Sequence, residues 1–349
     1  MKKLNLTKTS RRNFLTYGFV IVAYVILQSL AAGGHMSSML KGQLVPICAY
    51  VVMAISLNLT VGVLGELSLG HAGFMSVGAF MGTTTAIALQ NVIPSPTLRL
   101  ICALIVGAIF AGIVGFLVGI PVLRLNGDYL AIVTLAFGEI IKSIFNNMYL
   151  GLDAHGFHMS LLDNKLRMES EGKLIIGGPM GIGGIQKIAN FTVGFALIIV
   201  CLIVIFNLVN SRAGRAIMAI RDNRIAAESV GIPITKYKMM AFVTSAAMAG
   251  SAGALFALNF STIVANKFDF NTSILVLVFV VLGGLGNMLG SIIAAAALTI
   301  LPEALRQFAS YRMLVYAIVL ILVMLVRNNP TIKSFFERFR FGKKGGAEE

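Results

Sequence analysis

The stretch 211–238, SRAGRAIMAIRDNRIAAESVGIPITKYK, is the most polar long interruption in a chain that is otherwise mostly apolar. Apolar runs about as long as a membrane span flank it at 191–209 and 239–258. Its basic side chains, set against only Asp222 and Glu228, are Arg212, Arg215, Arg221, Arg224, Lys236 and Lys238. Because Lys and Arg near the ends of spans resist translocation, this stretch predicts a cytoplasmic connector between two spans.

The connector contains the signals of a short helix. Asp222 and Asn223 are residue types that cap a helix N-terminus, and 224–230 is long enough for one or two turns. Gly231 supplies a C-terminal stop, and Pro233 prevents the helix from continuing. A short, rigid, charged helix in the cytoplasm is a handle for a soluble partner, although a plain solvated loop accounts for the composition equally well.

Composition places the chain in a membrane. Of its 349 residues, 57% are hydrophobic and 12% are charged, whereas soluble proteins are about 25% charged. The net charge of +14 comes from basic residues at the N-terminus, in the connector and in the C-terminal tail. That is the pattern of cytoplasmic segments beside anionic membrane lipid. These basic groups flank spans and show no nucleic-acid-binding motif, so we expect no nucleic acid partner.

The apolar runs predict ten membrane spans, each a helix because an open strand cannot satisfy its backbone polar groups in lipid. They lie near 14–32, 43–61, 68–89, 98–122, 128–148, 191–209, 239–258, 272–286, 288–303 and 312–327. The two at 272–286 and 288–303 are short for a bilayer, so we expect one or both to be broken or re-entrant. The predicted fold class is an all-α polytopic membrane protein with about ten transmembrane helices.

Small residues at helix-packing spacing recur in these spans. Gly78 with Gly82, Gly107 with Ala111, Gly115 with Gly119, and Gly250 with Gly253 are the examples. Because lipid provides little hydrophobic drive between helices, close approach through Gly and Ala contributes much of their association. We therefore expect these helices to pack closely, without any implication for the substrate.

The charges give the predicted topology. The first span reads as a retained signal anchor rather than a cleaved signal peptide, so the N-terminus is expected in the cytoplasm. An even number of spans then returns the C-terminus to the cytoplasm of a multi-pass cell-membrane protein. The predicted segments are a cytoplasmic 1–13, a membrane domain at 14–327 with an external loop at 149–190 and a cytoplasmic connector at 210–238, and a cytoplasmic tail at 328–349.

Six polar residues lie inside or beside the apolar runs, namely Asn58, Glu66, Ser68, His71, Thr134 and Glu139. Such groups are costly in lipid and usually face protein or water. Glycines around Glu66 predict irregular backbone, which is tolerated at membrane depth only against protein or a cavity. Because broken helices often line transport pathways, these six residues are candidates for pathway lining.

Simpler roles are open for two of them. Glu139 is three residues before Lys142, so a local ion pair on one helix face is an alternative. His71 stands alone and fits a structural histidine as well as a ligand. No metal site is expected, because the histidines have no metal-binding spacing and Cys48, Cys102 and Cys201 lie in apolar runs as small core residues.

Four stretches together resemble one family. SLNLTVGVLGELSLGHAGFMSVGAF at 56–80 and VFVVLGGLGNMLGSIIAAAAL at 278–298 resemble signatures of the branched-chain amino-acid ABC importer permeases. RLNGDYLAIVTLAFGEIIKSIFNN at 124–147 resembles the LivM-type subset, with Ala136 where that pattern usually has Gly. The segment 214–257 resembles the cytoplasmic coupling segment and the helix that follows it.

The resemblance implies a type II ABC importer-like machine. Such a permease pairs with a LivH-like second permease, two ATP-binding subunits that use ATP and Mg, and an extracytoplasmic substrate-binding protein. The chain itself is then no enzyme and binds no cofactor. The coupling helix would be 224–231, and the implied ATPase-coupling residues are Arg221, Asp222, Arg224, Glu228, Ser229, Gly231 and Pro233. The polar groups near 58–71 and 134–139 would border the pathway.

Three other functions are weighed against import of branched-chain amino acids. Urea and short-amide importers use closely related permeases that these motifs separate poorly. A secondary transporter driven by an ion gradient would need no docking helix. A membrane-embedded enzyme using Glu66, His71 and Glu139 finds little support, because the sequence contains no G-x-x-x-x-G-K-[ST], H-E-x-x-H or G-x-S-x-G.

Overall fold

The computed structural model describes residues 8–33, 38–125, 127–153, 156–161, 173–304, 317–318 and 321. The chain divides into a first unit, Met1–Ala296, and a second unit, Ala297–Glu349. The described residues of the second unit are helical and include the last turns of α11. The structural features below concern the first unit.

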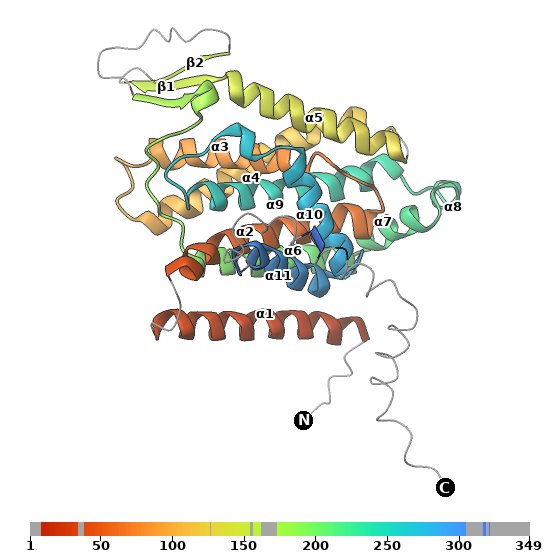
Figure 1. Ribbon diagram of the computed structural model, residues 1–349. Coiled ribbons are helices and arrows are strands. Elements are labelled where there is room, and N and C mark those ends of the chain that lie inside the picture. The colour runs from red at the N-terminus through yellow and green to blue at the C-terminus, as the bar shows by residue number, and fades with distance from the viewer. Residues whose placement is uncertain are drawn as a thin grey trace. The chain divides into compact units, whose positions relative to one another are not determined.

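The described residues are mostly helical (Figure 1). The N-terminal half contains α1 (Lys8–Ala32), α2 (Ser38–Asn58), the π-helical η1 (Leu59–Leu64), α3 (His71–Ala88), α4 (Pro96–Val122) and α5 (Asp128–Asn147). Then follow β1 (Tyr149–Asp153), β2 (Gly156–Ser160), β3 (Lys173–Gly177), the 3₁₀ turn η2 (Gly178–Met180) and α6 (Phe191–Asn210). The remaining elements are α7 (Arg212–Asp222), α8 (Arg224–Ser229), α9 (Ile234–Ala257), η3 (Ala265–Lys267), α10 (Phe270–Gly283) and α11 (Met288–Ala304).

The helices agree with the predicted spans. Each predicted span from 14–32 to 288–303 coincides with a helix, with ends that differ by a few residues. The predicted span 312–327 lies outside the described residues except at 317–318 and 321. Seven helices in the described part of the chain are long and apolar enough to cross a membrane. The chain is therefore a multi-pass membrane protein.

α2 with η1, α3 and α9 form the buried centre of the first unit. In the most apolar stretch of Leu40–Leu64, 83% of residues are buried, and in that of Ile234–Ala257 72% are buried. The corresponding share in Asn13–Ala31 is 11%. The peripheral helices α4, α5 and α6 expose bulky apolar side chains such as Ile109 and Ile132. Such faces are suited to contact with lipid, because lipid tails are as apolar as these side chains.

Glycines let α3, α4 and α9 approach closely. A Cβ atom at Gly78 of α3 would overlap the carbonyl oxygen of Gly250 on α9. A Cβ at Gly250 would lie 2.5 Å from the carbonyl oxygen of Gly107 on α4 and would overlap the side chain of Ala111. The packing role predicted for these small residues is confirmed.

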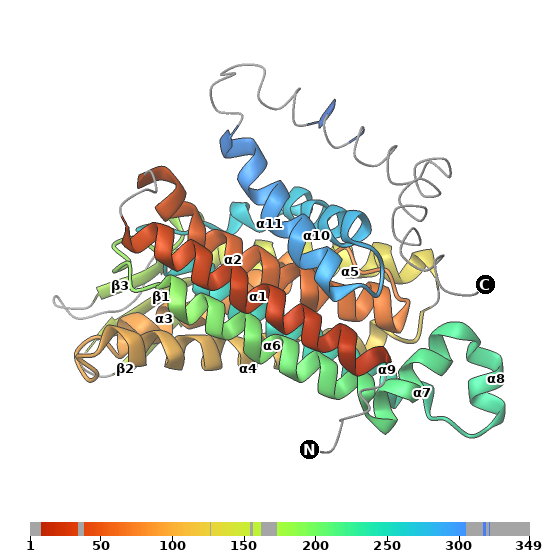
Figure 2. The same ribbon diagram turned by 90° about the horizontal axis from the view of Figure 1, so that it is seen from below.

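The predicted external loop contains a small antiparallel sheet that the all-α prediction did not include. Its strand order is β2-β1-β3, and in the β1–β2 hairpin Tyr149 pairs with Ser160. The side chains of Leu150, Ile175 and Ile176 are buried. Strands of five residues carry too short an alternation to stand out beside charged residues, which is why the sequence did not predict them. Figures 1 and 2 show β1 and β2 at one end of the helices and α7 and α8 at the other.

The connector contains a helix, α7, that was not predicted. Ser211 caps it, because the Ser211 side chain accepts from the Gly214 N–H at 3.1 Å. Gly214, Ile217 and Ile220 form its buried face. That spacing of three is a helical signal, which the many charges of the segment obscured.

We expect Gly250→Ala to destabilise the first unit, because its Cβ would overlap the side chain of Ala111. Overpacking a closely packed core costs about 1–3 kcal/mol. The matched control is Gly112→Ala on α4, whose Cβ would lie an ordinary 3.5 Å from that of Ala247. The measurement is the thermal unfolding midpoint of each purified variant in detergent. A midpoint for Gly250→Ala as high as that for Gly112→Ala would contradict the packing described.

Candidate functional site

The chain breaks its helical path between α2 and α3. α2 continues directly into η1, and Gly65, the residue after η1, has the left-handed conformation with φ +82°. Residues 66–70 are not helical, and α3 begins at His71. The N–H groups of Gly65 and Glu66 both donate to the carbonyl oxygen of Thr60. The irregular backbone predicted here is confirmed, and residues 59–70 are called the first break below.

Side chains of neighbouring helices satisfy backbone groups beside the first break. The Leu69 N–H donates to Oγ1 of Thr134 on α5 at 3.1 Å, and that hydroxyl donates to the Ala131 carbonyl at 2.8 Å. The Ala72 N–H, in the first turn of α3, donates to Oγ of Ser273 on α10 at 3.1 Å. Because an unpaired backbone group away from water is costly, these hydroxyls stabilise the non-helical chain.

A second break separates α10 from α11 at residues 284–287. Gly284 and Gly286 have φ of +103° and +76°. Asn58, buried at the end of α2, accepts from the Gly286 N–H at 2.8 Å and donates to Oγ of Ser291 on α11 at 2.9 Å. One buried amide therefore joins the first break to the second. The expectation that one or both of the spans at 272–286 and 288–303 are broken or re-entrant stays a prediction, because α10 and α11 are each continuous and residues 284–287 lie between them.

His71 is buried at the start of α3. Its Nε2 lies 2.9 Å from Oγ of Ser56 on α2, and the Ser56 carbonyl accepts from Oγ of Ser245 on α9 at 2.6 Å. The His71 Nδ1, the Ser68 Oγ and the Thr60 Oγ1 are buried and have no hydrogen-bond partner among the described residues. Buried polar atoms normally have a partner, so these three are the available hydrogen-bonding groups of the first break.

The two acidic candidates each pair with a lysine. Glu66 forms an ion pair with Lys238 of α9, and their side chains are 14% and 3% exposed. Glu139 pairs with Lys142 one turn along α5, as the local alternative predicted, and its side chain is 43% exposed. The structure thus places Asn58, Glu66, Ser68, His71 and Thr134 at the first break, whereas Glu139 is paired on the surface of α5. Whether these residues line a pathway stays a prediction.

The short helix predicted in the connector is confirmed as α8, with both of its ends capped. The Asn223 side chain accepts from the Ala226 N–H at 3.0 Å. At the other end Gly231 has φ +81°, and its N–H donates to the Glu228 carbonyl at 3.0 Å. Pro233 then precedes the first residue of α9. α8 is therefore a short segment whose two ends are fixed by its own sequence.

One of the predicted coupling residues, Arg221, contacts a distant part of this chain. Nη1 of Arg221 donates to the Gly62 carbonyl in η1 at 3.1 Å. Nε and Nη2 of Arg221 donate to Oδ1 of Asp222 at 3.0 and 2.9 Å. The side chains of Arg221 and Asp222 stay 39% and 67% exposed. A role in docking an ATPase stays a prediction for Arg221 and Asp222. The same holds for Arg224, Glu228 and Ser229 on α8.

Comparison with known proteins shows the family of this chain. Residues 39–324 match the family described as "Branched-chain amino acid transport system / permease component". The chain belongs to this family.

Individual relatives agree with the family. The chain is 35% identical over 288 residues to the high-affinity branched-chain amino acid transport system permease protein LivM of Salmonella typhimurium and of Escherichia coli. These matches cover 80% of this chain and 66% of each relative, so the chain spans just under two thirds of their length. It is 28% identical over 279 residues to the probable branched-chain amino acid transport permease protein LivM of Methanocaldococcus jannaschii. That match covers 69% of this chain and 74% of the relative. No solved structure is significantly similar to this chain.

Reasoning from the sequence did not single out some of the residues that the structure makes candidates for a functional role in this permease. Ile225 and Val230 lie at the two ends of α8 and are 81% and 74% exposed. Large apolar side chains so exposed among charged residues are unusual for a solvated loop, and that contrast was the available signal. Lys238 was recognised as a basic residue of the connector, but its pairing with Glu66 was not predicted. The partner serines Ser273 and Ser291 carried no signal, because serine is common in membrane helices.

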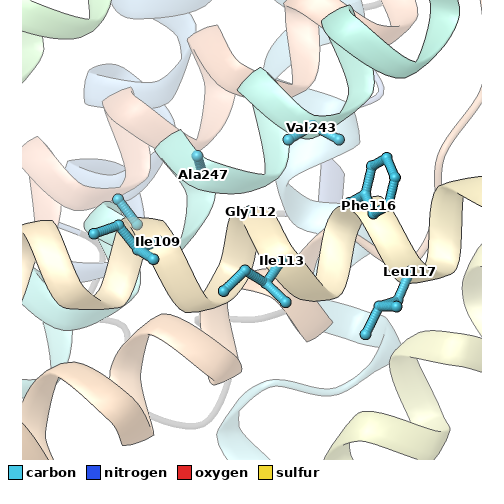
Figure 3. A pocket seen from close by; sticks show the side chains of 8 residues that line it. Ile109, Gly112, Ile113, Phe116, Leu117, Val243 and Ala247 are labelled. Carbon is cyan, nitrogen blue, oxygen red and sulfur yellow. The ribbon is translucent and has the colours of Figure 1, made fainter. Parts of the chain in front are cut away.

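A groove of about 480 Å³ lies between α4 and α9. Its lining is almost wholly apolar and includes Ile109, Ile113, Phe116, Leu117, Val243 and Ala247 (Figure 3). A polar solute needs a few placed hydrogen-bonding groups, which this groove lacks. In this permease the polar groups of the first break, and not the groove, are therefore the candidate site. Within the described part of the chain, no group of three or more His, Cys, Asp or Glu side chains is arranged to hold a metal.

We expect Asn58→Ala to destabilise the permease by about 1–3 kcal/mol, because it leaves the half-buried Gly286 N–H without its acceptor. Hydrogen exchange at 284–287 should rise together with the loss of stability. The control is Thr244→Ala on α9, whose hydroxyl bonds only to the Met240 carbonyl one turn earlier in the part of the chain described. Exchange at 284–287 that is unchanged in Asn58→Ala, measured by mass spectrometry, would show that Asn58 does not hold the second break.

Proposed function

We propose that this chain is a permease subunit of an ATP-driven importer and forms half of the translocation pathway for branched-chain amino acids by alternating access. The observation that carries the proposal is the family match across residues 39–324. The names of the LivM relatives, which refer to branched-chain amino acid transport, support the choice of cargo. The two breaks support a transport role, because irregular backbone inside a membrane protein typically borders a solute path.

The proposed machine contains further subunits. A LivH-like second permease completes the pathway, and an extracytoplasmic substrate-binding protein delivers the solute. Two ATP-binding subunits bind and hydrolyse ATP with Mg, because this sequence has no phosphate-binding loop of its own. α8 is the docking element for one of them. Its capped ends support this role, since a rigid short helix transmits a rigid-body movement better than a flexible loop does.

The proposed orientation puts α7 and α8 in the cytoplasm of a cell-membrane protein, with both chain termini on the same side. Six of the nine exposed basic residues of the described chain support this orientation, because they lie in the connector and at the adjacent end of α4, whereas Lys41, Lys187 and Lys267 lie elsewhere. The six are Arg124, Arg212, Arg215, Arg221, Arg224 and Lys236. Basic residues near span ends favour the cytoplasmic side. The sheet of β1 to β3, at the other end of the helices, then lies outside the cell (Figure 1).

The direct test is uptake by proteoliposomes that contain this chain, its second permease and two ATPase subunits, with the binding protein outside. We expect leucine uptake that requires ATP inside the vesicles and persists when ion gradients are collapsed. Urea should not compete with leucine. Competition by urea would reassign the cargo to urea or short amides. Uptake driven by an ion gradient without ATP would replace the proposal by a secondary transporter.

We expect the double variant Ile225→Asp, Val230→Asp to lose the ATPase subunits, because two exposed apolar contacts of α8 become charged. The fraction of ATPase that copurifies with the permease complex should fall at least tenfold. Met180→Asp is the control, since Met180 is 80% exposed but follows β3 in the proposed external segment. ATPase copurification that is equal in the two preparations would exclude α8 as the docking element.

A further inference from the structure

The part of the connector that contains α8, residues 221–238, is attached to the first break at both of its ends. At one end, Arg221 in the last turn of α7 donates to the Gly62 carbonyl at 3.1 Å. At the other end, Lys238 in the second turn of α9 forms an ion pair with Glu66. α8 lies between these two attachments along the chain. The residues that flank it, Asn223 and Val230, are exposed. Any displacement of α8 relative to the membrane helices therefore acts on residues 62–66.

Arg221 binds at the C-terminal end of the helix that α2 and η1 form. The continuous helix of α2 and η1 stops at Leu64, and the last carbonyls of a helix have no partner within it. A cation is also favoured at this end by the helix dipole. The Arg221 guanidinium supplies both the hydrogen bond and the charge.

The backbone makes room for this contact. A Cβ at Gly65 would lie 2.5 Å from Cγ of Arg221, and Gly65 itself has φ +82°. A side chain at position 65 would therefore collide with the stem of Arg221 as well as strain the backbone. The close approach of α7 to η1 depends on this glycine.

The two attachments differ in their exposure. The side chains of Lys238 and Glu66 are 3% and 14% exposed, so separating them would leave charges in a poorly solvated place. The side chain of Arg221 is 39% exposed and already shared with Asp222, whose own side chain is 67% exposed. Water and Asp222 can replace the Gly62 carbonyl at low cost, whereas Lys238 pairs with no acid other than Glu66 in the part of the chain that the structure describes.

We propose that Lys238–Glu66 is a fixed pivot and Arg221–Gly62 a releasable latch, through which movement of α8 changes the geometry of the first break. This inference rests on the proposed function, because it assigns how ATPase movement reaches the pathway. Arg221 and Lys238 are then positioning residues of the permease. The assignment gives Arg221 a role inside this chain, in contrast to the direct ATPase contact that the family resemblance implies.

The test uses the reconstituted complex and compares Arg221→Gln with wild type. Three quantities are measured: copurified ATPase, the rate of ATP hydrolysis, and solute imported per ATP hydrolysed. We expect copurified ATPase and hydrolysis within twofold of wild type, and at least a tenfold loss of solute imported per ATP. Arg221→Lys, which keeps the charge, should recover part of that ratio.

The matched control is Arg215→Gln on the same helix. Arg215 also donates to a backbone carbonyl, that of Asn210 at 3.3 Å, but this carbonyl ends α6 and is not part of the first break. Import per ATP for Arg215→Gln should stay within twofold of wild type.

A charge swap tests the pivot. Glu66→Lys and Lys238→Glu alone should each reduce the yield of folded complex, and the double variant that exchanges them should restore it at least halfway. No recovery in the double variant would overturn the pivot.

The outcomes separate the two proposals. If the wild-type complex shows no ATP-driven uptake, the proposed function fails before any variant is compared. If wild type transports and Arg221→Gln imports the same amount per ATP, the latch is wrong. If Arg221→Gln loses the ATPase itself, Arg221 is a docking contact and the latch is also wrong. If Arg221→Gln does not fold, Arg221→Lys decides: less solute imported per ATP with unchanged copurified ATPase would support the latch, and a wild-type ratio of import to hydrolysis would overturn it.

Discussion

The backbone groups left unpaired by a broken helix have to find partners away from water, and this constraint organises the centre of the permease. At the first break three of the partners are side chains, and each belongs to a different helix. Thr134 of α5 accepts from Leu69, Ser273 of α10 accepts from Ala72, and Arg221 of α7 donates to Gly62. At the second break one partner is the side chain of Asn58 of α2. Because such groups are costly when unpaired in a membrane, the break and the helices around it stabilise one another.

A second kind of packing surrounds these breaks. Where α3, α4 and α9 cross, glycines bring backbone against backbone, and no polar side chain is needed. Gly78 and Gly250 are in this group, with a carbonyl of one helix in the place that a side chain of the other would occupy. This region has little freedom to rearrange, because interiors packed so closely do not deform continuously. The breaks, held by single side-chain hydrogen bonds, are the places where two arrangements can differ.

The sequence predicted the helices well, since long apolar runs leave few alternatives in lipid. It also predicted the irregular backbone around Glu66 and the caps of α8, because Gly, Asn and Pro act locally. It did not predict which helix meets which break. The partner of Asn58 is 228 residues away along the chain, and a serine such as Ser273 looks the same whether it binds a distant N–H or its own helix. The sheet at 149–177 and the helix α7 were missed for a local reason, since charged residues interrupt their short periodic patterns.

The position of the connector follows from the same constraint that shapes the core. A helix that ends inside a membrane protein presents carbonyl groups and the negative end of its dipole. A cation satisfies both, and the neighbouring segment most rich in cations is the connector. Arg221 binds at the first break for this reason, whereas Lys238 binds there because Glu66 is a poorly exposed carboxylate that needs a cation. Once they are bound there, the segment between them is mechanically joined to the irregular backbone. The contacts that satisfy the end of η1 thus also link the connector to the polar centre of the first unit.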